Sequence, residues 1–132
     1  MNYDFLIGKA KEAREKAYVK YSNFKVGAAL LGKSGKVYTG CNIENASYGA
    51  TICAERVAFT KAISEGEKEF EAIAIVSSSD DITYPCGICR QFMSEFGLDL
   101  KLIFSDGHKV VTYKLSELLP YAFIKFETSK EV

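Results

Sequence analysis

The sequence predicts an α/β protein with a mixed five-stranded sheet and helices on both faces of that sheet. Helical and extended patterns alternate in the order α-β-β-α-β-α-β-β-α, and a helix between two strands favours parallel neighbours in the middle of the sheet. The short Asp106-Gly107 connection predicts that the last two strands are antiparallel. At 132 residues, the chain is expected to form one domain over residues 1–132.

The first half of the chain predicts a helix, a hairpin and a second helix. Small apolar residues recur at helical spacing among charged residues over residues 4–18. Two apolar runs, residues 24–31 and 37–43, flank the turn sequence GKSGK and predict a β-hairpin. Residues 44–51 have the composition of a loop, which leads to a helix over residues 53–64.

The second half predicts the remaining strands and helices. Residues 70–76 form a short apolar run that is typical of a buried strand. A polar, turn-rich segment separates this strand from the next helix. The further predicted elements are a helix over 87–96, strands over 100–104 and 110–113, a short helix over 116–119 and an aromatic tail over 121–126.

The composition excludes several classes of protein. Hydrophobic residues make up 48% of the chain, which argues against disorder. The 17 basic and 17 acidic residues cancel, so no electrostatic attraction to nucleic acid or to a membrane is expected. Neither a secretory signal nor a membrane-spanning run is found, and the expected location is the cytoplasm. The four cysteines of a cytosolic chain are expected to bind metal or to take part in catalysis.

The spacing of the cysteines suggests a metal site. Cys86 and Cys89 form a C-x-x-C motif at the start of a predicted helix, and Cys53 lies at the start of another. Helix N-termini favour thiolates, and three converging thiolates favour zinc. Cys41 could supply a fourth ligand of a closed structural site. It could equally be a buried thiol of the strand.

Glu55 and Arg56, which follow Cys53 closely in the sequence, suggest a catalytic site instead of a structural one. Glu55 would lie within reach of an open fourth position, where a metal-activated water molecule could exchange a proton with it. Arg56 could offset the net negative charge of three thiolates around a divalent ion. From spacing alone, catalytic zinc, structural zinc and a redox dithiol all remain open.

These motifs resemble those of a known family. The sequences CAER at 53–56 and PCGICRQ at 85–91 are similar to those of the zinc-dependent cytidine deaminases of the small homotetrameric type. The resemblance continues through FKVGAA at 24–29, GCNIENAS at 40–47 and LLP at 118–120, in the expected order. It implies a three-layer cytidine deaminase-like fold, a homotetramer and one Zn²⁺ per chain.

The resemblance also implies roles for individual residues. Metal ligands would be Cys53, Cys86 and Cys89, and Glu55 would be the catalytic proton shuttle. Phe24 would pack against the pyrimidine ring of the nucleoside. Asn42 and Glu44 would hydrogen-bond the ribose hydroxyls, and the Ala54 backbone would bind the polar edge of the base. Two further residues would support the metal ligands from outside: Arg56 and Gln91. Three residues would reach the active site of a neighbouring subunit: Ala46, Tyr48 and Phe123.

The implied reaction is the hydrolytic deamination of cytidine and deoxycytidine to uridine and deoxyuridine, with release of ammonia, in pyrimidine salvage. Deamination of another cytosine nucleoside, such as blasticidin S, is an alternative, although Phe24 and the intact CNIENAS sequence favour the ordinary nucleosides. A small zinc-stabilised binding module would use all four cysteines. The balanced charge and the lack of interleaved basic and aromatic residues disfavour a nucleic-acid editor.

Overall fold

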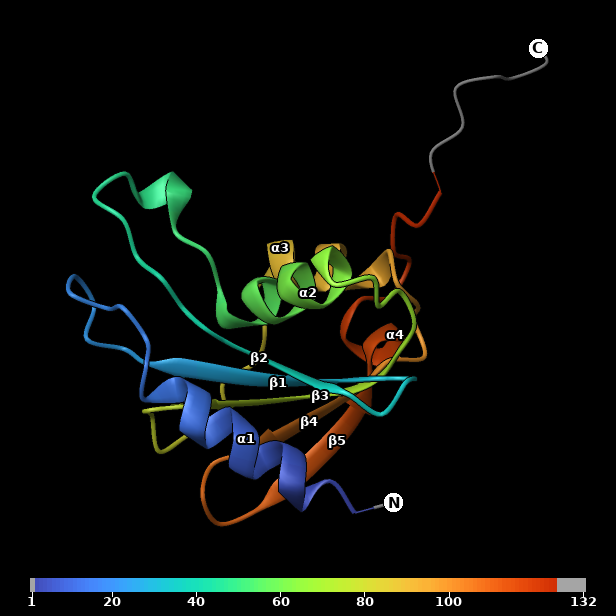
Figure 1. Ribbon diagram of the computed structural model, residues 1–132, viewed down its shortest axis with the longest axis horizontal. Helices are drawn as coiled ribbons and strands as arrows, with labels where there is room; N and C mark the ends of the chain where they lie inside the picture. Colours follow the sequence, from blue (N-terminus) through green and yellow to red (C-terminus); the bar gives the residue numbers. More distant parts are fainter. Residues whose placement is uncertain (1, 126–132) are drawn as a thin grey trace.

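A computed structural model describes residues 2–125 of the chain. A five-stranded sheet of order β2-β1-β3-β4-β5 forms its centre, and helices cover both faces of the sheet (Figure 1). The strands are Val26–Gly32 (β1), Val37–Cys41 (β2), Phe70–Ser77 (β3), Lys101–Ser105 (β4) and Val110–Lys114 (β5). The helices are Asp4–Arg14 (α1), Ala54–Ser64 (α2), Gly87–Ser94 (α3) and Leu115–Leu118 (α4), with a 3-10 turn at Tyr48–Ala50 (η1).

The strand pairing confirms the predicted mixed sheet. β3 and β4 are parallel and are joined through α3, whereas β4 and β5 are antiparallel and turn at Asp106-Gly107. β1 lies between β2 and β3 and is antiparallel to both. β2 and β3, which are joined through α2, therefore point in the same direction on either side of β1.

The interior strand β1 is buried along its whole length because both faces of the sheet are covered. Ala28 and Leu30 pack into one core with residues of α2 and α3. Ala29 and Leu31 point to the opposite face and pack with residues of α1. The helices thus form separate layers above and below the sheet, as Figure 1 shows.

Two glycines allow the helices to approach the sheet closely. A Cβ atom on Gly40 of β2 would lie 2.5 Å from the carbonyl oxygen of Ala54 and 2.6 Å from the amide nitrogen of Ala58, both in α2. On the other face, a Cβ atom on Gly27 would lie 2.0 Å from the carbonyl oxygen of Ala10 in α1. Gly40 therefore lets the first turn of α2, which follows Cys53, rest directly on the sheet.

The first and third helices end earlier than the sequence pattern predicts. α1 ends at Arg14 because Tyr18 pairs in extended conformation with the chain beyond β2: the Tyr18 amide donates to the Asn42 carbonyl at 3.0 Å, and the Glu44 amide donates to the Tyr18 carbonyl at 2.9 Å. α3 ends at Ser94, ahead of a turn that contains Gly97 at φ +122°. The 3-10 turn η1 lies within the predicted loop.

Within residues 2–125, none of the helices has the length and apolar character needed to cross a membrane.

Candidate metal centre and active site

Helices α2 and α3 begin at the cysteines that the sequence singled out. Cys53 is the N-cap of α2 and Cys86 is the N-cap of α3, and both have extended backbone conformations. Neither side chain caps its own helix, so each sulfur is free to point away from the helix end. The partial positive charge of a helix N-terminus stabilises a thiolate at such a position.

The structure brings three of the four cysteine sulfurs together. The Sγ atoms of Cys53, Cys86 and Cys89 all lie within 4.8 Å of one another, and the Cys53–Cys86 pair is separated by 3.8 Å. Zinc–sulfur bonds of about 2.3 Å at a tetrahedral angle require sulfur–sulfur distances of about 3.8 Å. The donor set and its spacing therefore fit a zinc ion. Cys41, at the end of β2, is not a member of this group, which argues against a four-thiolate site.

Contacts among the thiols and with the Arg56 guanidinium shift the pKa values of the cysteines in this cluster. A hydrogen bond from Cys89 lowers the pKa of Cys53 to about 5. The same contact raises the pKa of Cys89, which is fully buried. Arg56 donates from Nη2 to Cys53 Sγ over 3.7 Å and so places a positive charge against the sulfurs. Its Nε atom is buried and has no hydrogen-bond partner among residues 2–125.

Glu55 is the buried carboxyl group of the site. Its side chain is only 4% exposed, although it lies in the first turn of α2 and lines an open cavity. Burial is the largest cause that raises the pKa of Glu55 to about 7, and the neighbouring Cys53 contributes to the same rise. A carboxyl group in this range can both accept and return a proton.

A cavity of about 220 Å³ opens beside the sulfur cluster. Six of the residues that the sequence suggested line it: Phe24, Asn42, Cys53, Ala54, Glu55 and Cys86. The sequence analysis missed four further lining residues: Val26, Thr51, Thr83 and Tyr84. Their positions along the chain could have indicated them, because each lies within three residues of a predicted site residue.

The Asn42 side chain is buried at the wall of this cavity and is bonded to backbone at both ends. Its Oδ1 accepts from the Val26 amide at 2.9 Å, and its Nδ2 donates to the Phe24 carbonyl at 2.8 Å. Phe24 itself is 38% exposed at the cavity. Asn42 therefore fixes the backbone that carries the Phe24 ring.

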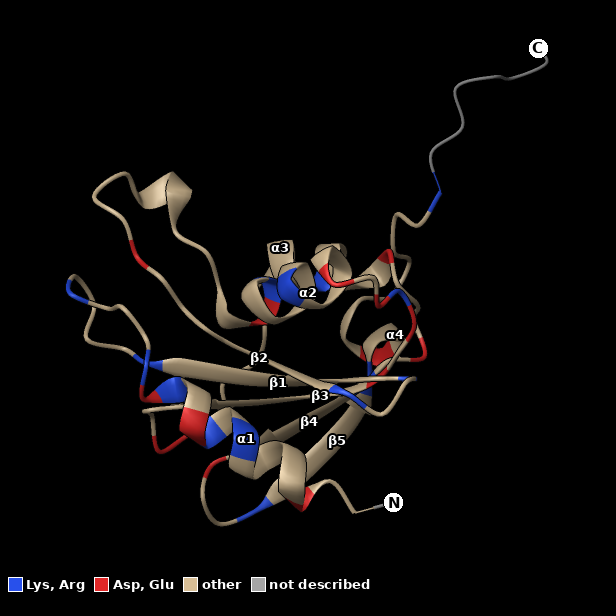
Figure 2. Ribbon diagram, viewed as in Figure 1, with Lys and Arg blue, Asp and Glu red and all other residues tan. Residues whose placement is uncertain are grey.

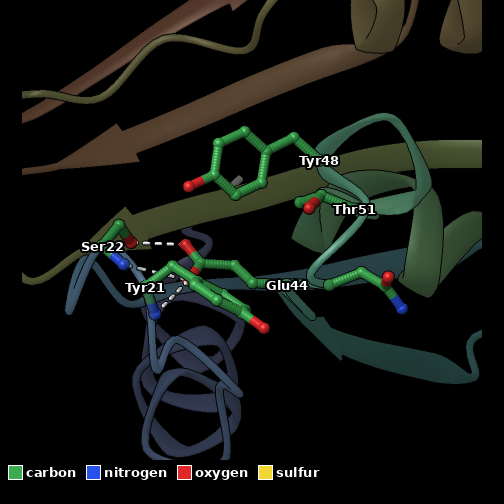
Figure 3. A pocket seen from close by; sticks show the side chains of 6 residues that line it. Tyr21, Ser22, Glu44, Tyr48 and Thr51 are labelled. Carbon is green, nitrogen blue, oxygen red and sulfur yellow. Dashed lines mark hydrogen bonds between the residues drawn. The ribbon is translucent and has the colours of Figure 1, made fainter.

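Glu44 lies outside the first cavity and lines a second one of about 360 Å³ with Tyr21, Tyr48 and others (Figure 3). The two cavities share Thr51. The Glu44 carboxylate accepts from the Ser22 hydroxyl and from the Tyr21 and Ser22 amides at 3.0 and 3.1 Å. These bonds, led by the hydroxyl, lower the pKa of Glu44. The Tyr21 and Tyr48 rings lie edge to face with their centroids 6.0 Å apart, and Figure 3 shows both beside Glu44.

Three other predicted site residues lie away from the sulfurs within one chain. Gln91 is exposed and donates from Nε2 to the Phe123 carbonyl at 2.8 Å. Phe123 and Ala46 are exposed and line neither cavity. The bond between Gln91 and Phe123 ties the predicted aromatic tail to α3, while residue 126 of that tail lies outside the described residues.

Comparison with known proteins matches residues 2–105 to the model of the cytidine and deoxycytidylate deaminase zinc-binding region. The chain is 45% identical to a cytidine deaminase of Sporosarcina psychrophila, over 98% of this chain and 96% of that protein. It is 50% identical to a cytidine deaminase of Halalkalibacterium halodurans, over 93% and 95%. The crystal structure of a cytidine deaminase from Burkholderia pseudomallei superposes with a TM-score of 0.89 at 48% identity, and the match covers 93% of this chain and all of that one.

Proposed function

This chain belongs to the zinc-dependent cytidine deaminase family, and from that premise we propose that it deaminates cytidine and deoxycytidine to uridine and deoxyuridine in pyrimidine salvage. The observation that carries the proposal is that three cysteine sulfurs converge beside a cavity, and that the buried Glu55 lines the same cavity. A closed structural site would have needed a fourth protein ligand, and Cys41 lies outside the group.

We assign the sulfurs of Cys53, Cys86 and Cys89 as the ligands of one zinc ion per chain. When bound, zinc supplies Lewis-acid activation of a water molecule. Arg56, in contact with Cys53, offsets the negative charge of the three thiolates. All three ligands lie at or in the first turn of α2 or α3, and the packing of each helix on the sheet fixes the directions of its sulfurs.

Glu55 moves the protons of the proposed reaction. Its carboxylate takes a proton from the attacking water and delivers one to N3 of the cytosine ring, while a C4–O bond forms. It then takes the remaining proton from the hydroxyl on C4 and passes it to the amino group as the C4–N bond breaks, which leaves uridine and ammonia. The low exposure of Glu55 keeps bulk water away from these transfers.

The walls of the cavity hold the nucleoside in this proposal. Phe24 packs against the pyrimidine ring, and the Ala54 backbone at the unpaired first turn of α2 meets the polar edge of the base. Asn42 and Glu44 bind the ribose hydroxyls. Both already hold backbone groups of residues 21–26, so they also set the position of Phe24.

Replacing Phe24 by alanine is expected to raise KM for cytidine about two- to tenfold and to change kcat much less, because the ring contributes contact rather than proton transfer. Steady-state kinetics measures this split. Phe5→Ala is the matched control, because Phe5 is a half-exposed ring of α1 on the other face of the sheet. An unchanged KM for Phe24→Ala would remove Phe24 from the binding site.

We further propose a homotetramer in which neighbouring subunits complete the cavities. Residues 43–52, here called the arm, extend away from the sheet between β2 and α2 (Figure 1). The arm exposes Ile43, Ile52 and 76% of Tyr48, and Glu44 is its one charged residue, as Figure 2 shows. An arm with a single charge and exposed apolar side chains is typical of a contact surface. Ala46 and Tyr48 of the arm and Phe123 of the tail are the residues proposed to reach a neighbouring site.

Light scattering tests the assembly. The expected mass is about four times the 14.6 kDa of one chain. A species of 14.6 kDa at working concentration would contradict the tetramer without affecting the assignment of the metal ligands.

Substrate assays test the function itself. We expect conversion of cytidine and deoxycytidine, and much slower conversion of blasticidin S. Preferential conversion of blasticidin S would favour the alternative function, the deamination of that nucleoside. If none of the three compounds is converted, the proposed function is wrong. The four free cysteines support a reducing compartment, and we propose the cytoplasm as the location.

A further inference from the structure

Arg90 directly follows the ligand pair Cys86–Cys89 and makes two hydrogen bonds that no part of the proposed chemistry uses. Its Nε donates to the Pro85 carbonyl at 2.8 Å, and its Nη1 donates to the Leu118 carbonyl at 2.7 Å. Both bonds are partly buried and short for N–H···O contacts. One guanidinium thus connects the residue before Cys86 with the end of α4, which lies 28 positions beyond Arg90 itself.

Side-chain contacts hold the chain just before Cys86: Pro85 is buried, the Tyr84 ring packs against Phe104, and the Thr83 hydroxyl bonds the Ser77 hydroxyl at 2.6 Å. Residues 78–86 contain no helix or strand, and Cys86 is exposed without a side-chain cap. Cys89 is different, because it is fully buried within α3 and packs in the core. The position of the Cys86 sulfur relative to the Cys89 sulfur therefore depends on how the Pro85-Cys86 segment is fixed to α3.

Arg90 supplies that connection from within α3. Its amide donates to the Cys86 carbonyl at 3.0 Å as part of the first helical turn, and its side chain reaches back one residue further to Pro85. The second bond, to Leu118, anchors the guanidinium to α4, which packs against α3 and β5. A planar guanidinium can hold two carbonyls in fixed directions at once, whereas an ammonium group is a point charge on a flexible stem.

We infer that Arg90 is a positioning residue that fixes the Pro85-Cys86 segment to α3 and α4 and thereby holds the Cys86 thiolate in place for zinc. The inference rests on the proposed metal site, and it goes beyond that site because it assigns a role to a side chain that contacts neither the sulfurs nor the cavity in the structure. Groups that orient a metal ligand in this way commonly contribute about 10–100-fold to metal affinity.

The test is the rate at which zinc leaves the purified protein in excess chelator. Arg90→Met keeps an unbranched apolar stem in place of the arginine stem and removes both bonds, and we expect zinc release about 10–100-fold faster than from the wild-type chain. Arg90→Lys should release zinc nearly as fast as Arg90→Met, since lysine keeps the positive charge but lacks the planar guanidinium that can donate to two carbonyls at once. Arg14→Met is the matched control: Arg14 also donates to a backbone carbonyl, that of Ser77 at 2.8 Å, but it belongs to α1, and its release rate should equal that of the wild type.

Cobalt substitution provides a readout that a general loss of stability would not move. The thiolate-to-cobalt absorption of Arg90→Met should change in intensity or position, and that of Arg14→Met should match the wild type. Wild-type release rates and spectra in both Arg90 variants would overturn the inference. Failure of the wild-type chain itself to bind zinc and to convert cytidine would instead overturn the proposed function, so the two failures are distinguishable.

Discussion

The Glu55→Gln variant is expected to bind zinc like the wild-type chain and to lose on the order of 10²–10⁴ in kcat with cytidine. The substitution keeps the shape of a side chain that is 4% exposed, so the packing of α2 should survive. It removes the carboxylate that we propose takes the proton from water and returns it to the substrate. Metal analysis and steady-state kinetics on the same preparation measure both parts of this result.

Glu12→Gln serves as the control for this variant, because Glu12 is an exposed carboxylate of α1 on the other face of the sheet. Its zinc content and kcat should equal those of the wild type. Equal activity of Glu55→Gln and the wild type would remove Glu55 from the catalytic role. Loss of zinc from Glu55→Gln would make that role structural.

Cys86→Ser is expected to lose both zinc and activity. Cys86 is the exposed member of the sulfur group, so the change creates no cavity in the core. A serine hydroxyl is a poor zinc ligand, and removing a ligand should weaken metal binding by more than the roughly 10–100-fold attributed to an outer-shell partner. Zinc content after dialysis and the rate of cytidine conversion measure the effect.

The matched control is Cys41→Ser, which changes the one cysteine outside the sulfur group. Burial raises the pKa of Cys41, which suits a neutral thiol of a strand rather than a ligand thiolate. This variant should keep both zinc and activity. A metal-free Cys41→Ser protein would restore the four-thiolate structural site, and full zinc occupancy of Cys86→Ser would remove Cys86 from the ligand set.

The fold and the sulfur group followed from local sequence patterns. Alternating helical and extended segments and the short Asp106-Gly107 turn predicted the mixed sheet, because these signals act over a few residues. The helix starts at Cys53 and Cys86 predicted that the thiols could converge. The exclusion of Cys41 could not be predicted from spacing, since it depends on where β2 ends relative to the two helices.

The remaining details depend on contacts between distant segments. Tyr18 falls within a helical sequence pattern but pairs in extended conformation with residues 42–44. No local sequence signal predicts this pairing. The family resemblance implies that Asn42 and Glu44 bind the nucleoside, yet their bonds to the backbone of residues 21–26 appear only in three dimensions. The two carbonyl partners of Arg90 likewise lie in different segments, 5 and 28 positions away.

The most direct test of catalysis at the three-sulfur site is a zinc titration of the metal-free protein with cytidine conversion as the readout. Activity should rise in proportion to added zinc and level off at one equivalent per chain, while Glu55→Gln takes up the same zinc without gaining activity. Conversion of cytidine that is independent of zinc, or a plateau at a different number of ions per chain, would contradict a single catalytic zinc at Cys53, Cys86 and Cys89.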